Sequence, residues 1–207
     1  MSECCGCHET AARLASQRRV LWIVLAINAV VFIAEFGAGW WASSVAVQAD
    51  SLDSLGDASV YAVSLLVLRR SERDRAWAAA FKGVIQLLFG LAVLAEAAHK
   101  LLAVSVVPLA PVMAIAAGGA LLANLACFAL LMRHRSDGLN MRSVWLCSRN
   151  DVIGNAGTLV VAGIVALTGS RWPDILFGIA LALLFLHTSW QVLRGAFQVL
   201  RPTSPQL

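Results

Sequence analysis

Charged residues are scarce in this chain. Only 14% of its 207 residues are Asp, Glu, Lys or Arg, whereas 59% are hydrophobic and the mean hydropathy is +0.76. Average soluble domains are about 45–50% apolar and about 25% charged. Too few polar side chains are present to cover a water-soluble globule of this size, so the composition predicts an integral membrane protein.

Proline, glycine and cysteine are also sparse, with 5, 15 and 5 copies. These numbers exclude a collagen-like chain, a disordered low-complexity chain and a disulfide scaffold. The sequence has no HExxH motif, no paired catalytic Asp–Gly motif and no recognisable Ser/His/Asp set, so we do not expect an enzyme. No soluble segment interleaves basic and aromatic residues, and nucleic-acid binding is therefore not expected either.

Six apolar stretches are long enough to cross a bilayer, whose hydrocarbon core of about 30 Å requires roughly 20 residues of helix. Short connections with charged or turn-forming residues separate them. The predicted fold is therefore an all-α bundle of six transmembrane helices. The expected spans are Val20–Trp41, Val45–Leu68, Ala76–Ala98, Val112–Met132, Ser143–Leu167 and Ile175–Leu193.

Basic residues are distributed unevenly around these spans. Twelve arginines lie before the first span, after the second, after the fourth or after the sixth, whereas only Lys100 and Arg171 lie in the other connections. Because basic residues concentrate on the cytosolic side, we expect both termini in the cytosol. The predicted parts are a cysteine-rich cytosolic tail (residues 1–19), a transmembrane domain (20–200) and a short C-terminal tail (201–207).

Several acidic residues lie inside the predicted spans. A carboxylate at the centre of an inserted helix costs roughly 2.5–3.5 kcal/mol, so such groups usually face the bundle interior or a wet cavity and mark ion pathways. The acidic residues in question are Glu35, Asp50, Asp53, Asp57, Glu96 and Asp151.

Asp50, Asp53 and Asp57 are spaced so that they share one face of the second span, each about one turn from the next. Ionisation of all three neighbouring carboxylates near mid-membrane is unfavourable, because like charges repel one another. Protonation or a bound divalent cation would relieve the repulsion, and a site that alternates between the two is a metal/proton exchanger. The alternative is a polar seam that bonds neighbouring helices.

The fifth span offers a matching face. Cys147 and Asp151 are four residues apart, and Asn155 follows one turn later. A thiolate and a carboxylate from this span, added to Asp53 and Asp57, would give four ligands of mixed sulfur and oxygen, which suit tetrahedral Zn²⁺. Cys147 could instead be an inert buried thiol, because free cysteine is among the most buried residue types.

With these motifs, the sequence resembles the cation diffusion facilitator family of divalent-metal/proton antiporters, from about Arg18 to Leu200. Ser44–Asp57 (SVAVQADSLDSLGD) fits the second-span pattern S-x-A-x-x-A-D-x-x-[HD]-x-x-x-D. The fifth-span pattern is His-x-x-x-Asp; Asp151 matches the Asp, but Cys147 occupies the His position. Supporting matches are Asn28, Glu35, Gly39, Asn124 and Asn140.

The resemblance implies a transport site formed by Asp53, Asp57, Cys147 and Asp151 between the second and fifth spans. It implies efflux of a divalent cation in exchange for protons, by alternating access, across a bacterial inner membrane, with no resident cofactor. Cysteine in place of histidine favours soft or borderline ions such as Zn²⁺ and Cd²⁺.

Other candidate ligands lie outside this set. Asp50, Glu35 and Asn155 are candidates for accessory polar groups. A cluster near the N-terminus could capture metal or be a disordered tail; its members are Cys4, Cys5, Cys7 and His8.

Family members commonly carry a cytosolic metal-binding domain after the sixth span, through which they dimerise. Because this sequence ends at Leu207, we expect a homodimer formed through the transmembrane helices. The alternative function is a membrane metal sensor or chaperone without translocation, which the cysteine-rich tail favours and the depth of Asp53 and Asp151 disfavours.

Three further polar side chains are predicted to be structural. Glu96 is expected to pair with His99 or Lys100, Cys127 to pack in the core and His187 to form a satisfied hydrogen bond.

Overall fold

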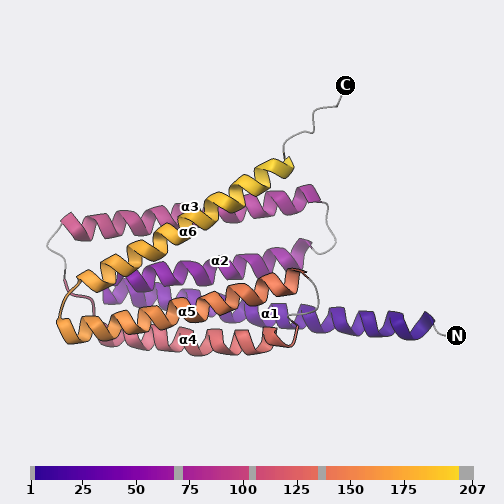
Figure 1. The fold of residues 1–207 in the computed structure, drawn as a ribbon, viewed down its shortest axis with the longest axis horizontal. Helices are drawn as coiled ribbons and strands as arrows, with labels where there is room; N and C mark the ends of the chain where they lie inside the picture. Colours follow the sequence, from indigo (N-terminus) through magenta and orange to yellow (C-terminus); the bar gives the residue numbers. More distant parts are fainter. Residues whose placement is uncertain (1–2, 68–71, 103–105, 135–138, 201–207) are drawn as a thin grey trace, which may run out of the picture.

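The computed structural model describes residues 3–67, 72–102, 106–134 and 139–200, which form six α-helices without any strand (Figure 1). The predicted all-α six-helix bundle is confirmed. In chain order the helices are α1 (Glu3–Ala42), α2 (Val45–Val67), α3 (Glu72–Leu102), α4 (Ala110–Met132), α5 (Leu139–Thr168) and α6 (Trp172–Leu200).

Five helices, all except α2, contain segments long and apolar enough to cross a membrane. The second helix has the same 23-residue length as α4 but carries Asp50, Asp53 and Asp57. Within the described ranges, α2 is the one helix that contacts all five others. This central position explains how a helix with three carboxylates fits in a membrane, since its polar face meets protein instead of lipid.

The first helix is continuous over 40 residues, so the predicted boundary between residues 19 and 20 is not a break in secondary structure. At 1.5 Å per residue such a helix is about 60 Å long, roughly twice the hydrocarbon thickness. Its N-terminal part extends past the other helices (Figure 1). The backbone of Cys4, Cys5, Cys7 and His8 belongs to this part, and their side chains lie outside the described residues.

Two helices, α3 and α6, lie side by side along one side of the bundle, whereas α1, α2, α4 and α5 form the other (Figure 1). Glycines permit close packing within this pair: a Cβ on Gly83 would lie 2.8 Å from Leu193 Cγ, and one on Gly90 would lie 2.9 Å from Leu186 Cδ2. The sixth helix ends at the same end of the bundle at which α1 begins, as an even number of spans requires.

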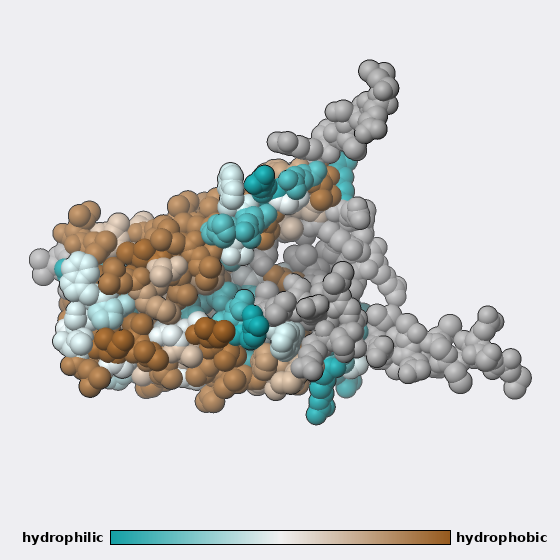
Figure 2. Space-filling model, in the orientation of Figure 1, coloured by the Kyte–Doolittle hydropathy of each residue, from teal (hydrophilic) through white to brown (hydrophobic). Residues whose placement is uncertain are grey.

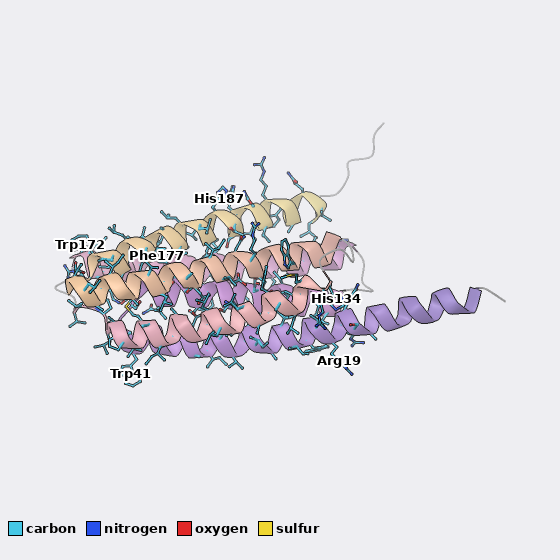
Figure 3. The ribbon with its side chains drawn as sticks, turned by 60° about the horizontal axis from the view of Figure 1, so that its bottom comes forward. Arg19, Trp41, His134, Trp172, Phe177 and His187 are labelled. Carbon is cyan, nitrogen blue, oxygen red and sulfur yellow. The ribbon has the colours of Figure 1, made fainter. Side chains whose placement is uncertain are left out.

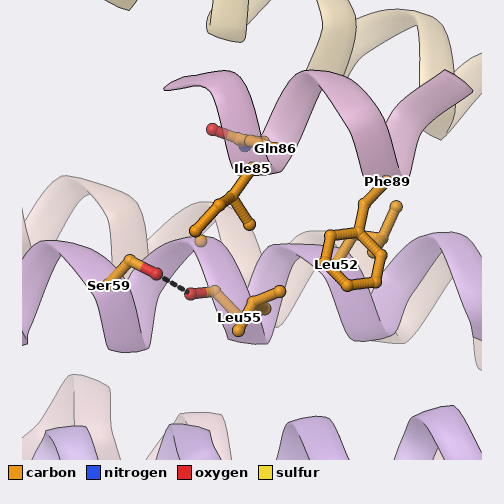
Figure 4. Close-up of a pocket in the computed structure, with 7 residues that line it drawn as sticks. Leu52, Leu55, Ser59, Ile85, Gln86 and Phe89 are labelled. Carbon is orange, nitrogen blue, oxygen red and sulfur yellow. Dashed lines mark hydrogen bonds between the residues drawn. The ribbon is translucent and has the colours of Figure 1, made fainter. Parts of the chain in front are cut away.

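The contact between α2 and α3 is apolar. Leu52 and Leu55 face Ile85 and Phe89 across a void of about 10 Å³, which is about the size of one water molecule (Figure 4). Ser59 on α2 donates a hydrogen bond to its own helix, at the Leu55 carbonyl 2.8 Å away. This void is a packing defect between two helices and has no room for a ligand.

The outer surface matches a lipid environment. Hydrophobic side chains cover most of the face in Figure 2, and hydrophilic ones gather toward the end at which α1 begins. Figure 3 shows Trp41 and Trp172 at one end of the bundle and Arg19 and His134 toward the other. Trp41 is 75% exposed. Tryptophans are typical of the membrane interface.

Asp174 has a different place from the one that its sequence context suggests. The pattern puts it in a connection between spans, but it lies in the first turn of α6 with a fully buried side chain. Its carboxylate accepts hydrogen bonds from Ser44 Oγ (2.5 Å), Val45 N (2.8 Å) and Ala46 N (3.0 Å). These amides begin α2 and have no partner within the helix, so a side chain of α6 caps α2.

The three polar side chains expected to be structural are confirmed as such. Lys100 Nζ lies 3.2 Å from Glu96 Oε1. Cys127 is completely buried, and His187 Nε2 lies 2.9 Å from Gln191 Nε2. None of them belongs to a metal site in the part of the chain that the structure describes.

Replacing Gly178 by alanine tests the contact between α6 and the start of α2. The added Cβ would lie 2.6 Å from Val45 Cγ1, 2.8 Å from Val45 C and 2.9 Å from Ala46 N. Because backbone atoms cannot move aside cheaply, we expect Gly178→Ala to lower the free energy of unfolding by about 1–3 kcal/mol, measured by denaturant unfolding in detergent.

Gly195→Ala is the matched control in the same helix, since nothing lies within 4 Å of its Cβ position. This variant should be unchanged or more stable by up to about 1 kcal/mol. Equal stability of the two variants would contradict the packing described.

Candidate metal centre

Three aspartates from two helices converge in the interior. Asp53 and Asp57 come from α2 and Asp151 comes from α5; one carboxylate oxygen of each lies within 4.8 Å of the other two. Asp57 and Asp151 are buried, and Asp53 is half-buried. The spacing of four residues on α2 places both of its carboxylates on the face that meets α5. The predicted approach of the second and fifth spans is therefore present in the structure.

The three carboxylates line a cavity of about 550 Å³ between α2, α3, α5 and α6. Other polar groups on its wall belong to Asp50, Gln86 and Asn150. Leu181 and Phe185 are among the apolar residues that α6 contributes. The cavity is therefore a mid-bundle chamber with its acidic groups on α2 and α5.

The charges on the cavity wall are all of one sign. Four aspartates line it, and none of the described lining residues is Lys or Arg. Carboxylates in a low-dielectric interior are stable only with a positive partner or as the protonated acid. The site can therefore accept a cation or protons. Zn²⁺ bound to carboxylates at about 2.0–2.2 Å would require only a modest contraction of this group.

Tyr61 is a site residue that the sequence reasoning missed. Its hydroxyl donates a hydrogen bond of 2.6 Å to Asp57 Oδ2. The tyrosine is fully buried against Leu21, Val24 and Leu131. It is the sole tyrosine of the sequence and lies one turn after Asp57, which is a signal that could have identified it. The bond fixes the orientation of the Asp57 carboxylate inside the bundle.

The remaining predicted residues of α5 differ in their roles. Cys147 lies one turn before Asp151 in α5, but its side chain lies outside the described residues. Asn155 is buried and its amide donates to the main-chain carbonyl of Asp151, 3.0 Å away. Asn155 is absent from the cavity wall, so its contact supports the helix around Asp151.

The two accessory acids form a second polar cluster beside the first. Asp50 lines the same cavity, whereas Glu35 of α1 does not. Glu35 instead accepts a hydrogen bond from Ser54 Oγ at Oε2 (3.1 Å), so it bonds a neighbouring helix. Both side chains are 1% exposed.

Known proteins match this chain along most of its length. The family model for the cation efflux transmembrane domain matches residues 21–201. The zinc transporter ZitB of Yersinia pestis is 26% identical over 204 residues, which cover 92% of this chain and 65% of the relative. The metal cation efflux system protein CzcD of Cupriavidus metallidurans is 29% identical over 196 residues, with 88% and 61% covered.

A relative from an animal matches as well. The zinc transporter ttm-1 of Caenorhabditis elegans is 26% identical over 218 residues, covering 90% of this chain and 53% of the relative. The chain thus spans less than two thirds of the length of these three relatives.

Tyr61→Phe tests the hydrogen bond to Asp57. Removing the hydroxyl leaves a buried carboxylate oxygen without this donor, and hydrogen bonds to charged groups contribute about 1.5–3 kcal/mol. We expect metal-free Tyr61→Phe to lose stability by an amount in this range and to bind Cd²⁺ with altered affinity, measured by unfolding and by equilibrium dialysis. Ser59→Ala, which removes a hydroxyl that bonds only to its own helix, is the control. Wild-type stability and affinity in Tyr61→Phe would show that the bond does not support the site.

Proposed function

The chain belongs to the cation efflux family. From this membership we propose a transport function. In this proposal the chain carries a divalent metal cation out of the cytosol through the group formed by Asp53, Asp57 and Asp151. Zn²⁺ and Cd²⁺ are the proposed cargo, and the printed names of the relatives, zinc transporter and metal cation efflux protein, support that choice.

One observation supports this proposal above the others. Three carboxylates from α2 and α5 lie within 4.8 Å of one another in a cavity whose described wall offers no Lys or Arg. A purely structural polar seam would leave no buried carboxylate oxygen without a donor. Asp151 Oδ2 is instead buried without a hydrogen-bond partner among the described residues. A mobile cation would supply a partner for this oxygen.

Protons are the proposed counter-substrate. Carboxylates must be deprotonated to bind a metal, so metal and protons compete for the same oxygens. When the cation leaves on the far side, protonation of Asp53, Asp57 and Asp151 stabilises the empty site. The protonated site then no longer binds the cation, so the cation does not return. Alternating access then needs the protein to favour one opening with metal bound and the other with protons bound.

Cys147 is the proposed fourth ligand. It precedes Asp151 by four residues of α5, a spacing at which two positions of a helix share one face. A thiolate among oxygen ligands softens the site and favours Zn²⁺ and Cd²⁺ over Mn²⁺ and Mg²⁺. The N-terminal cluster is proposed to deliver metal from the cytosol; its members are Cys4, Cys5, Cys7 and His8.

The proposed setting is a bacterial inner membrane, with both termini in the cytosol. Arg19 lies toward the end at which α1 begins, and basic residues concentrate on the cytosolic side, which supports this orientation (Figure 3). We further propose a homodimer formed through the transmembrane helices.

Flux into proteoliposomes tests the transport proposal. We expect wild-type protein to move Zn²⁺ and Cd²⁺ faster when a proton gradient opposes the metal gradient, because the two share one site. Asp57→Asn removes a carboxylate charge and should lower flux at least tenfold, as losses in metal-site variants commonly do. Glu96→Gln is the control, since Glu96 pairs with Lys100 away from the cavity.

The outcomes separate the alternatives. Metal binding without flux in wild type would identify a sensor or chaperone in place of a transporter. Wild-type flux in Asp57→Asn would show that the transported metal does not bind at the three-aspartate group. In the same assay, Cys147→His should shift preference from Cd²⁺ toward Zn²⁺ if the thiol is a ligand.

A further inference from the structure

A second pair of carboxylates lies beside the three-aspartate group. Glu35 of α1 and Asp50 of α2 are each 1% exposed. Ser54 Oγ donates to Glu35 Oε2 over 3.1 Å. Since Asp50 and Ser54 are four residues apart on one face of α2, this bond brings Glu35 to the face that carries Asp50. The two carboxylates are close enough to act on each other electrostatically.

Each member of the pair has one oxygen without a partner. Glu35 Oε1 and Asp50 Oδ2 are buried and form no hydrogen bond with any described residue. A proton shared between the two carboxyls, or a cation between them, would give these oxygens a partner. Two open carboxylate oxygens from different helices, both shielded from solvent, call for an occupant with positive charge.

The position of the pair relates it to the transport site. Asp50 precedes Asp53 by three residues, or about 4.5 Å along the helix, toward the turn between α1 and α2. Asp50 lines the same cavity as the three aspartates, and Thr158 of α5 is near enough to act on its carboxylate. A Cβ on Gly154 of α5 would lie 3.5 Å from Asp50 Oδ1, so the glycine leaves room beside this carboxylate.

We propose that Glu35 and Asp50 form a second divalent-cation site, with the hydroxyls of Ser54 and Thr158 as neighbouring oxygen donors. The site lies between the three-aspartate group and the α1–α2 turn. The site can bind a cation whether or not the protein transports one. That a transported ion binds there on its way out rests on the proposed function. Its donors are all oxygen, so it binds Cd²⁺ and Zn²⁺ less tightly than a group that includes a thiolate. Weaker binding suits an ion in transit.

The number of Cd²⁺ ions bound per chain tests this site. Equilibrium dialysis with radioactive Cd²⁺ would use the full chain in detergent. In this parent protein Cys4, Cys5 and Cys7 are changed to Ser and His8 to Ala, so that the N-terminal cluster does not bind Cd²⁺. We expect two ions per chain in this parent, one in Glu35→Gln, one in Asp57→Asn and none in the double variant. Glu96→Gln should keep two.

Two further variants guard against misfolding. Glu35→Asp retains the charge but withdraws the carboxylate by one methylene, so it should keep two ions with weaker affinity at one of them. Ser54→Ala should weaken the same ion without changing the count.

Two ions in Glu35→Gln, or a single ion in the parent, would overturn the second site. Measuring flux as well distinguishes failure of the second site from failure of the proposed transport function. Loss of flux in Asp57→Asn, with unchanged flux and ion count in Glu35→Gln, would leave transport intact and refute only the second site. Two ions with no flux in the parent would retain the site and refute transport.

Discussion

A group of carboxylates in the interior of a membrane bundle is the constraint from which the rest follows. Asp53, Asp57 and Asp151 share a cavity with Asp50, and no Lys or Arg belongs to its described wall. In a low-dielectric interior such a group is stable only when something positive occupies it. We therefore propose that this group of carboxylates takes up cations or protons.

The helix arrangement keeps these carboxylates away from lipid. The second helix contacts every other helix, so its carboxylates avoid lipid. Its first turn is held by the Asp174 carboxylate of α6, and Gly178 allows α6 to approach the same turn closely. Tyr61 then fixes one oxygen of Asp57 at the other end of the site. The helix with the three carboxylates Asp50, Asp53 and Asp57 is thus also the helix that contacts all the others in the described part of the chain.

Local patterns in the sequence predicted most of this architecture. Apolar run lengths identify the six helices, and the spacing of Asp53, Asp57 and Asp151 identifies two faces that meet. Contacts between distant segments were beyond those patterns. Asp174 looks like a loop residue until α6 is placed against α2. The bond between Glu35 and Ser54 likewise joins α1 to α2 and has no signature in either helix alone.

Proton release on metal binding tests the central claim most directly. The measurement titrates metal-free protein with Zn²⁺ in weakly buffered solution near neutral pH, in a variant whose Cys4, Cys5, Cys7 and Cys147 are serine and whose His8 is alanine. Carboxylates are then the expected proton source. If cations and protons alternate at the aspartates, each bound Zn²⁺ releases at least one proton, and Asp57→Asn reduces the yield. Stoichiometric Zn²⁺ binding with no proton release would contradict the account.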